Sequence, residues 1–378
     1  MKIQRAFVWE FTRKLDGKTW NPAFRWTERR APLLVIELDN GIRGIGEAWS
    51  GYRGVDQILE TLKQEVAPVL LGLTVDTPEH FASRLAGVRQ CAATRESSAA
   101  WSAADIALWD AYGRQHDKPV WELLGGRESK APVYASGGLY RDDYTLTDLS
   151  AEARAYRTAG FNGMKMKVCG LSVEEDLQRI GAVREGLGHD AWLWVDAVNQ
   201  LSVESARSFW KAIERFEVKA VQSPLPPTDL IGLCDLNQNA FPVVASEAEY
   251  DHEVFRQMLG RRAITHLQFC IPLVGGFSGA IKLDDWAGAI GIRSTPQCFS
   301  TAVAQAATLH FSAARANVLS AEFHCFHDHL KALYQGDAGR ISDGYAQAGC
   351  GGGLSIAIPE LGEQPDGSVI SCVVDVSR

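Results

Sequence analysis

A pair of lysines is the first feature of the chain that could carry chemistry. Lys165 and Lys167 are two positions apart, with Met166 between them. Side chains of an extended strand alternate between its two faces, so both ammonium groups would project from the same face. Close positive charges that are partly shielded from water disfavour protonation, and a lysine tuned in this way can act as a general base. The same spacing also fits two solvated surface lysines.

Other polar side chains stand where the following strands are expected to end. Asp196 and Glu247 could converge and hold a hard divalent cation such as Mg²⁺, which takes oxygen ligands and keeps waters. They could instead form salt bridges with the two lysines or with Arg293. In chain order the whole series is Lys165, Lys167, Asp196, Gln222, Glu247, Cys270, Gln297 and Glu322.

The elements that must position these residues alternate between strand-like and helix-like segments. Helical stretches such as 174–185 and 203–214 separate short apolar segments, and about eight repeats predict a parallel sheet that closes into a barrel. Active sites of such barrels lie at the carboxyl ends of the strands, where the polar series is found. The expected strands are 133–135, 164–168, 193–198, 220–221, 243–245, 267–271, 292–295 and 318–322.

The N-terminal third predicts a second, smaller unit. Segments 33–38 and 42–49 are expected strands, joined by the Asp-Asn-Gly turn signal at 39–41. Gly44 and Gly46 inside the second strand indicate a close approach of another backbone.

Residues 55–126 are expected to be helical, with a clear helical period over 99–116. The last strand-like segment, 368–374, could return to this unit.

Composition and charge exclude several classes of protein. Hydrophobic residues make up 46% and charged residues 22% of the 378 positions, which is typical of soluble globular chains. The net charge of −8, without a basic run, argues against a nucleic-acid partner or an anionic membrane surface. No apolar run approaches the ~18 residues of a membrane helix, and Glu10 interrupts the only candidate for a signal peptide. We therefore expect a cytoplasmic protein.

Eight scattered cysteines form no CxxC pair, so we expect reduced, mostly buried thiols rather than disulfides or structural zinc. Cys270 could be a nucleophile or a packing residue, and its only local activators would be the lysines. The eight positions are Cys91, Cys169, Cys234, Cys270, Cys298, Cys325, Cys350 and Cys372.

Several short motifs, in order along nearly the whole chain, resemble the mandelate racemase/muconate lactonising branch of the enolase superfamily. Each motif is weak alone, but their order is specific. They are Gly44-Ile45-Gly46-Glu47, residues 104–113 (ADIALWDAYG), residues 119–126 (PVWELLGG), Lys165-Met166-Lys167, Asp196-Ala197, Pro224-Leu225-Pro226-Pro227 and Val274-Gly275-Gly276.

The resemblance implies an α+β capping domain over a modified TIM barrel of the (β/α)7β type. It divides the chain into a capping domain at 1–126, the barrel at 127–345 and a segment at 346–378 that returns to the capping domain. It also implies a homo-oligomer, Mg²⁺ bound by three acidic residues on successive strands, and removal of a proton α to a carboxylate. Enolase-superfamily sites use a Lys or His base with Mg²⁺ stabilising the ene-diolate.

Carried over position by position, the resemblance makes Lys167 the base and Lys165 its electrostatic partner. Asp196 and Glu247 match the first and third metal ligands. Gln222 occupies the position of the second, where the family has a glutamate. An amide still offers a neutral carbonyl oxygen, but the site loses one negative charge, so metal affinity should fall.

The other catalytic face departs further from the family pattern. Cys270 stands where relatives have an aspartate or a lysine, and Gln297 stands where racemase-type members have a histidine. The family asparagine after the first ligand is replaced by Val198, with Asn199 displaced by one. Glu322 matches the carboxylic acid that hydrogen-bonds the substrate.

With one equipped face, ordinary two-base racemisation is not expected. We expect syn dehydration of an acid sugar by a single lysine base, with a small carboxylate or acid-sugar substrate bound by Asn199, Gln297, Glu322 and Arg25 or Arg30. A sugar-lactone cycloisomerase or a racemase-like isomerase is an alternative. A member that has lost turnover and only binds a ligand is the rival from a different class.

Three histidines follow the last expected strand. His324, His327 and His329 could replace the missing histidine, bind a metal, or be ordinary residues of a surface loop.

Overall fold

Eight parallel strands within the described residues 130–324 form the larger sheet and close into a barrel. The computed structural model describes residues 1–51, 53–78, 80–81, 83, 85 and 94–377. Every neighbouring pair of barrel strands is parallel, and a parallel bridge between Ser294 and Val318 closes the ring beside the last strand. The strands are β6 (Lys130–Gly137), β8 (Gly163–Lys167), β9 (Trp192–Asp196), β10 (Val218–Gln222), β11 (Val243–Ala245), β12 (His266–Leu267), β13 (Arg293–Ser294) and β15 (Ala321–His324).

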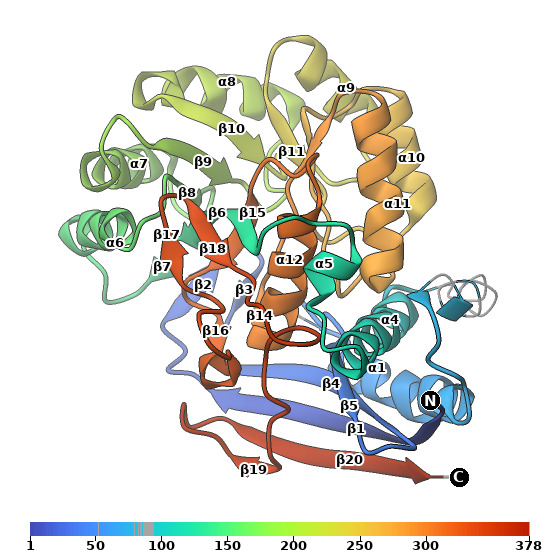
Figure 1. The fold of residues 1–378 in the computed structure, drawn as a ribbon. Coiled ribbons are helices and arrows are strands. Elements are labelled where there is room, and N and C mark those ends of the chain that lie inside the picture. The colour runs from blue at the N-terminus through green and yellow to red at the C-terminus, as the bar shows by residue number, and fades with distance from the viewer. Residues whose placement is uncertain (52, 79, 82, 84, 86–93, 378) are drawn as a thin grey trace.

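One helix follows each of the first seven barrel strands in the same described range, and they cover the outside of the barrel (Figure 1). They are α6 (Leu146–Thr158), α7 (Val173–Leu187), α8 (Val203–Ile213), α9 (Leu230–Gln238), α10 (His252–Gly260), α11 (Gly276–Ala289) and α12 (Ala302–Ala314), with the short 3₁₀ turns η2 (Glu214–Phe216) and η3 (Lys331–Leu333). The predicted (β/α)7β barrel is therefore confirmed.

The strands predicted at 267–271 and 292–295 are shorter than expected. The ladder between them stops after Leu267 and Ser294 and returns only as the isolated bridge between Cys270 and Gln297. The chain thus leaves regular pairing at the level where these two residues enter the site.

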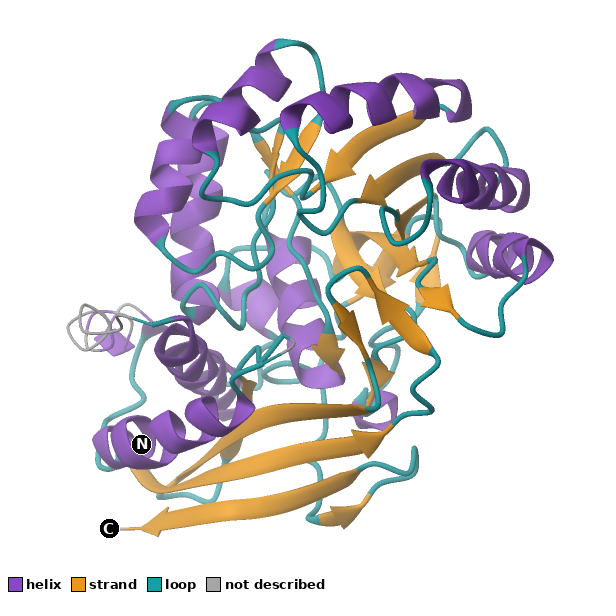
Figure 2. Cartoon of the chain, turned by 180° about the vertical axis from the view of Figure 1, so that it is seen from behind, coloured by secondary structure: helices purple, strands orange, loops and turns teal. Residues whose placement is uncertain are grey.

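The capping sheet is antiparallel and includes the C-terminal strand. Its order is β19-β20-β1-β4-β5, and β1 pairs with β20, so both termini lie at the same end of this sheet (Figures 1 and 2). The strands are β1 (Ile3–Lys14), β4 (Glu28–Leu38), β5 (Arg43–Glu47), β19 (Gly362–Glu363) and β20 (Val369–Ser377).

The cap also contains helices, and small strands complete the fold. In the part of the cap that the structure describes, the helices are α1 (Val55–Thr61), the π-helix η1 (Leu62–Val66), α2 (Ala67–Leu70), α4 (Arg95–Gln115) and α5 (Val120–Leu123). The small strands are β2 (Thr19–Asn21), β3 (Phe24–Arg25), β7 (Tyr140–Arg141), β14 (Ser300–Thr301), β16 (Asp328–His329), β17 (Ile341–Ser342) and β18 (Tyr345–Gln347).

The domain boundaries at 126/127 and 345/346 remain predictions. Strand β18 spans the second boundary and pairs with β6 of the barrel, so the chain is still joined to the barrel there.

Helix α4 joins the capping sheet to the barrel. A Cβ atom on Gly44 would lie 2.3 Å from the carbonyl oxygen of Ala107, and one on Gly46 would lie 2.0 Å from that of Ala103. The predicted close backbone approach is confirmed, because only glycine lets β5 lie this near to α4. On its other side, Asp105 of α4 accepts hydrogen bonds from Ser278 of α11.

A buried glutamate makes a second joint between cap and barrel. Glu47 ends β5 and is fully buried, and its Oε2 accepts hydrogen bonds from the Thr301 hydroxyl at 2.6 Å and from the backbone N–H of Ala304 at 3.1 Å. Burial raises the pKa of Glu47, and the hydroxyls and N–H groups at the start of α12 partly offset this. The cap is thereby fixed to α12, the last barrel helix.

The seven cysteines within the described residues are free thiols, and Cys91 lies outside those residues. The prediction that they are mostly buried is wrong, since only Cys270 and Cys298 are buried while Cys350 and Cys372 are exposed on a loop and on β20. Along the described ranges, the structure has no helix with the length and apolar character needed to cross a membrane.

The contact between β5 and α4 gives a stability prediction. Gly46→Ala should lower the free energy of unfolding by about 3 kcal/mol or more, because the added methyl overlaps a backbone oxygen that cannot move alone. Urea unfolding followed by circular dichroism measures this. Gly260→Ala is the matched control: nothing lies within 4 Å of its ideal Cβ, so the free energy should stay unchanged or rise by up to about 1 kcal/mol. Equal stability of the two variants would contradict the packing account.

Candidate active site

Strand register places the first three site residues side by side. Lys167 is paired with Asp196 across β8 and β9, and Asp196 is paired with Gln222 across β9 and β10. Paired residues of parallel strands share a face, so all three project into the barrel at the carboxyl ends of their strands. Below this level the interior is filled by Tyr134 and Trp194, which closes the site from beneath.

Lys165 is a buried lysine that is paired with two carboxylates. Its Nζ lies 3.2 Å from Oδ2 of Asp196 and 2.9 Å from Oε1 of Glu322. Burial alone would lower the pKa of Lys165, but the carboxylates of Glu322 and Asp196 outweigh it and hold the pKa well above its usual value. The expectation of a lowered pKa from the paired lysines is therefore wrong for Lys165, because two carboxylates neutralise the positive charge.

Asp196 is the centre of this cluster. Its Oδ2 accepts hydrogen bonds from both Lys165 and Lys167, and its Oδ1 accepts one at 3.0 Å from the backbone N–H of Val198. Burial would raise the pKa of Asp196, but the ammonium groups of Lys167 and Lys165 reverse the effect, so the carboxyl remains ionised. The sequence alternative of a salt bridge with the lysines is present in the structure.

The other two proposed metal ligands contact each other. The amide nitrogen of Gln222 lies 2.6 Å from Oε2 of Glu247, and the Gln222 oxygen lies 3.2 Å from the amide nitrogen of Gln268. Burial raises the pKa of Glu247 to about 7; Lys167 opposes this shift and Asp196 adds to it. Asp196, Gln222 and Glu247 therefore converge on one corner of the barrel mouth.

The amide pair shows how this corner can accept a cation. The oxygen of Gln268 is buried without a hydrogen-bond partner. The nitrogen and oxygen of an amide have nearly the same shape, so turning both amides by 180° lets Gln222 donate to that orphaned oxygen. The Gln222 oxygen would then face Glu247 and could be shared with a cation. The three side chains thus fit Mg²⁺, which prefers oxygen donors.

The donor set is weaker than three carboxylates. Across the residues that the structure describes, no group of three or more His, Cys, Asp or Glu side chains is placed to hold a metal ion. The amide at position 222 is the reason, since two carboxylates remain around it.

In the described part of the chain, the wall opposite the lysines presents a thiol and an amide at the two positions where the family pattern has its second base. Cys270 and Gln297 are bridged to each other and are each 1% exposed. Burial raises the pKa of the Cys270 thiol well above its usual value, which favours the packing interpretation over a nucleophile. Within the described ranges, the amide oxygen of Gln297 and Oε2 of Glu322 are buried without hydrogen-bond partners, so both can accept hydrogen bonds from a ligand.

Two predicted substrate-binding residues lie at the edge of this arrangement. Asn199 follows β9 with an exposed side chain, and it and Val198 have φ angles of 59° and 50°. This left-handed conformation suits asparagine but strains a β-branched residue such as Val198. Arg25 is committed elsewhere: its guanidinium donates to both oxygens of Asp142 at the surface, at 2.5 and 3.1 Å. The structure therefore does not place Arg25 with Lys167.

Between Arg25 and Arg30 lies a buried arginine, Arg29, that the sequence analysis did not single out. Arg29 donates hydrogen bonds to the carbonyl oxygens of Gly51 and Phe299 and to the Ser300 hydroxyl. It thereby ties the cap to the loop that follows Gln297. Its neighbour Arg30 pairs with Glu10 and Asp56 of the cap.

The three histidines are buried, so their interpretation as a surface loop is wrong. His324, His327 and His329 are at most 3% exposed. The rings of His324 and His327 pack against Phe299, and that of His329 packs against His327. Burial is the largest cause that lowers the pKa of all three, which keeps them neutral. They do not form a metal-binding group among the described residues.

Comparison with known proteins decides the family. Residues 21–125 match the mandelate racemase/muconate lactonizing enzyme N-terminal domain, and residues 148–361 match the enolase C-terminal domain-like family. The chain belongs to the mandelate racemase/muconate lactonizing enzyme branch of the enolase superfamily. The resemblance inferred from the sequence motifs is confirmed.

Relatives in this branch are enzymes that differ in reaction. An arabinonate dehydratase from Saccharolobus solfataricus is 29% identical over 282 residues, covering 74% of this chain and 75% of the relative. A D-galactarolactone cycloisomerase from Agrobacterium fabrum is 30% identical over 318 residues, covering 83% of each. A racemase from Streptomyces coelicolor A3(2), solved with bound magnesium, superposes with a TM-score of 0.84 at 24% identity, over 94% of this chain and 97% of that one.

The amide at position 222 gives a binding prediction. Gln222→Glu should tighten Mg²⁺ binding about tenfold, because it restores a carboxylate between Asp196 and Glu247. Isothermal calorimetry measures the dissociation constant. Gln238→Glu adds the same charge at the exposed end of α9 and should leave the affinity unchanged. Equal or weaker binding by Gln222→Glu would exclude Gln222 as a ligand.

The Glu247 carboxyl predicts how binding depends on pH. With a pKa of about 7, Glu247 is protonated at lower pH, and the proton must leave before the oxygen can coordinate a cation. Mg²⁺ affinity should therefore rise with pH and level off above about 7, falling by up to tenfold per unit below it. Calorimetry between pH 5.5 and 8 tests this, and Glu247→Gln should remove the dependence. A flat profile for the unmodified chain would contradict it.

Proposed function

We propose that the chain removes the proton α to the carboxylate of an acid sugar with Lys167 as the single base, and that the usual outcome is syn dehydration. The observation that carries the proposal is the asymmetry of the site. Lys167 and Lys165 enter from β8, whereas the wall opposite them holds Cys270 and Gln297. Among the described residues, these two positions supply no second proton carrier for the other face of the substrate, so in this proposal one lysine serves both proton transfers.

Each residue then has a separate task. Lys167 takes the α-proton and returns it to the hydroxyl that leaves from the same face, so that water departs. Lys165 cannot serve as the base, because Glu322 and Asp196 keep it charged. Its fixed ammonium instead stabilises the negative charge that develops on the substrate carboxylate. Glu322 contributes an acceptor oxygen for the substrate.

A cation would be held by Asp196, Glu247 and the carbonyl oxygen of Gln222. Bound there, Mg²⁺ supplies the additional positive charge that makes a proton next to a carboxylate acidic enough for an amine to remove. The racemase of the same fold that carries magnesium supports testing this metal first.

The polar lining supports a hydroxyl-rich substrate. The free oxygens of Gln297 and Glu322 accept hydrogen bonds and have no protein donors, which suits the hydroxyl groups of a sugar acid. The arabinonate dehydratase and the galactarolactone cycloisomerase among the relatives point to the same substrate class. Cycloisomerisation of a sugar lactone remains the alternative reaction for the same base.

A ligand-binding role without turnover is the second candidate. One observation favours it: the Asp196 oxygen that a cation would need already accepts hydrogen bonds from both lysines. In that case acid sugars would bind, but no proton would exchange.

The role of Lys167 is tested by substitution. Lys167→Ala removes the side chain, and Lys167→Met keeps an unbranched side chain of similar length without the amine. Both variants should slow exchange of the α-proton in D₂O by about 10²–10⁴-fold, because the proposed base is lost. NMR of a panel of acid sugars measures the exchange, and circular dichroism checks folding. Lys219→Ala removes an exposed lysine on β10 and should exchange at the normal rate. Undiminished exchange in both Lys167 variants would refute the assignment.

A further inference from the structure

A buried arginine holds the end of the strand that carries Lys167. Arg179 of α7 donates one hydrogen bond from Nη1 to the carbonyl oxygen of Lys167 at 2.8 Å and another from Nη2 to that of Gly138 at 2.8 Å. Gly138 follows β6, the neighbouring strand. The guanidinium therefore ties the carboxyl ends of two neighbouring barrel strands together at the level of Lys167.

The carboxylate of Asp176 links Arg179 to the loop that follows Lys167. Asp176 accepts hydrogen bonds from Arg179 at 3.0 Å, from the Tyr140 hydroxyl at 2.6 Å and from the backbone N–H of Cys169 at 2.6 Å. The Tyr140 hydroxyl in turn accepts one from the N–H of Gly170 at 2.8 Å. Asp176, Arg179 and Tyr140 are at most 7% exposed.

The loop held in this way begins one residue after Lys167 and is conformationally demanding. Cys169 has a φ of 67°, a left-handed conformation that side chains other than glycine and asparagine seldom adopt. Strain of this kind persists only where surrounding contacts enforce it. The hydrogen bonds at Cys169 and Gly170 supply that enforcement.

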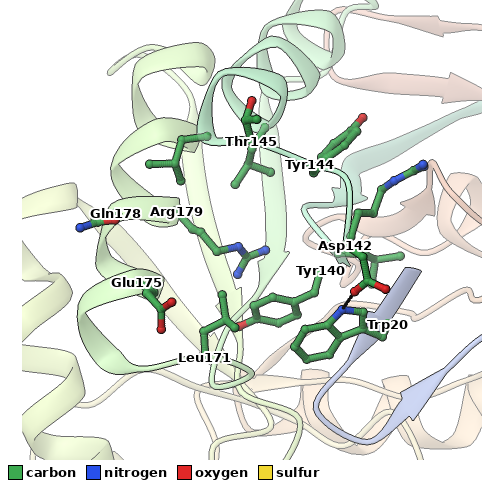
Figure 3. Close-up of a pocket in the computed structure, with 13 residues that line it drawn as sticks. Trp20, Tyr140, Asp142, Tyr144, Thr145, Leu171, Glu175, Gln178 and Arg179 are labelled. Atoms are coloured by element: carbon green, nitrogen blue, oxygen red, sulfur yellow. Dashed lines mark hydrogen bonds between the residues drawn. The ribbon is translucent and has the colours of Figure 1, made fainter. Parts of the chain in front are cut away.

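The Tyr140 ring also connects the network to the capping domain (Figure 3). The Arg179 guanidinium lies 3.8 Å from the centre of the Tyr140 ring, and Trp20 of β2 stacks on the same ring at 4.5 Å. Beside these rings is a cavity of about 430 Å³ between α6, α7 and the cap strand β2. Tyr140 is thus held between a barrel arginine and a cap tryptophan.

We infer that Tyr140, Asp176 and Arg179 form a positioning network that fixes Lys167 in its reactive place. The inference rests on the proposed role of Lys167 as the base. The three residues would act through the backbone of residues 167–170, with which they form hydrogen bonds. A base must be held within about 0.5 Å of its productive position, and a displacement near 1 Å can cost about 10²-fold in rate.

The first test removes one oxygen atom. Tyr140→Phe keeps the ring between Trp20 and Arg179 but loses the hydrogen bonds to Asp176 and from Gly170. We expect kcat for acid-sugar turnover to fall 10- to 100-fold with KM within twofold of normal, and Mg²⁺ affinity to stay unchanged. Tyr144→Phe is the matched control, because it removes a hydroxyl from an exposed tyrosine that lines the same cavity.

A second readout does not depend on turnover. Hydrogen–deuterium exchange of backbone amides, followed by mass spectrometry on peptides covering 163–172, should accelerate in Tyr140→Phe and stay normal in Tyr144→Phe. In Arg179→Lys the remaining ammonium can keep one of the two carbonyl contacts, so this variant should retain more activity and protection than Arg179→Met. Unchanged amide exchange in both Tyr140→Phe and Arg179→Met would overturn the inference.

The positioning network and the proposed function can be refuted by different results. Faster amide exchange together with a kcat equal to that of the normal chain, per folded molecule, would show a purely structural role and overturn the inference. Absence of α-proton exchange in the unmodified chain with every acid sugar that binds would sink the proposed function; faster amide exchange in Tyr140→Phe would then still show that the network holds the loop.

Discussion

The structure depends on a buried ion cluster in which Asp196 holds two lysines. Transferring a charge from water to the interior costs several kcal/mol, and removing one partner of a buried pair costs about 3–5 kcal/mol, so the members stand together. Asp196, Glu247 and Glu322 face Lys165 and Lys167, which leaves one excess negative charge when all are ionised. A divalent cation together with a substrate carboxylate would supply one positive charge and neutralise the interior. The cluster therefore favours binding the two together over binding either alone.

The amide at position 222 matters through the same balance. A glutamate there would add a second excess negative charge and bind a cation strongly even without substrate. In the proposed metal site, Gln222 would lower the affinity for the free metal and make it more dependent on the carboxylate of the substrate. Gln268, whose oxygen has no partner among the described residues, could hold the Gln222 amide in the orientation that presents its oxygen to the cation. Under this proposal, the amide alters the conditions under which the cation binds and still allows it to bind.

Local sequence patterns predicted the fold and the grouping of the site residues, whereas contacts between residues far apart in the sequence could not be predicted. The two-residue spacing of Lys165 and Lys167 and the alternation of strands and helices predicted the fold and the shared face of the site. The charge state of Lys165 was predicted wrongly because it depends on Glu322, which comes from the far end of the barrel. The ion pair of Arg25 with Asp142 could not be predicted, because the sequence around an exposed charged residue does not reveal a partner that is distant along the chain. The network around Arg179 gave no signal, since its members lie on different elements and follow no period.

A single lysine base confines proton transfer to one face of the substrate. The most direct measurement is the configuration of the α-carbon in acid sugar recovered after partial turnover in D₂O with Mg²⁺, determined by NMR and chiral chromatography. We expect deuterium to enter this position with the original configuration retained, because the amine that removes the proton also returns it. Accumulation of the deuterated epimer would reveal a second base on the wall formed by Cys270 and Gln297 and would refute a single-base mechanism.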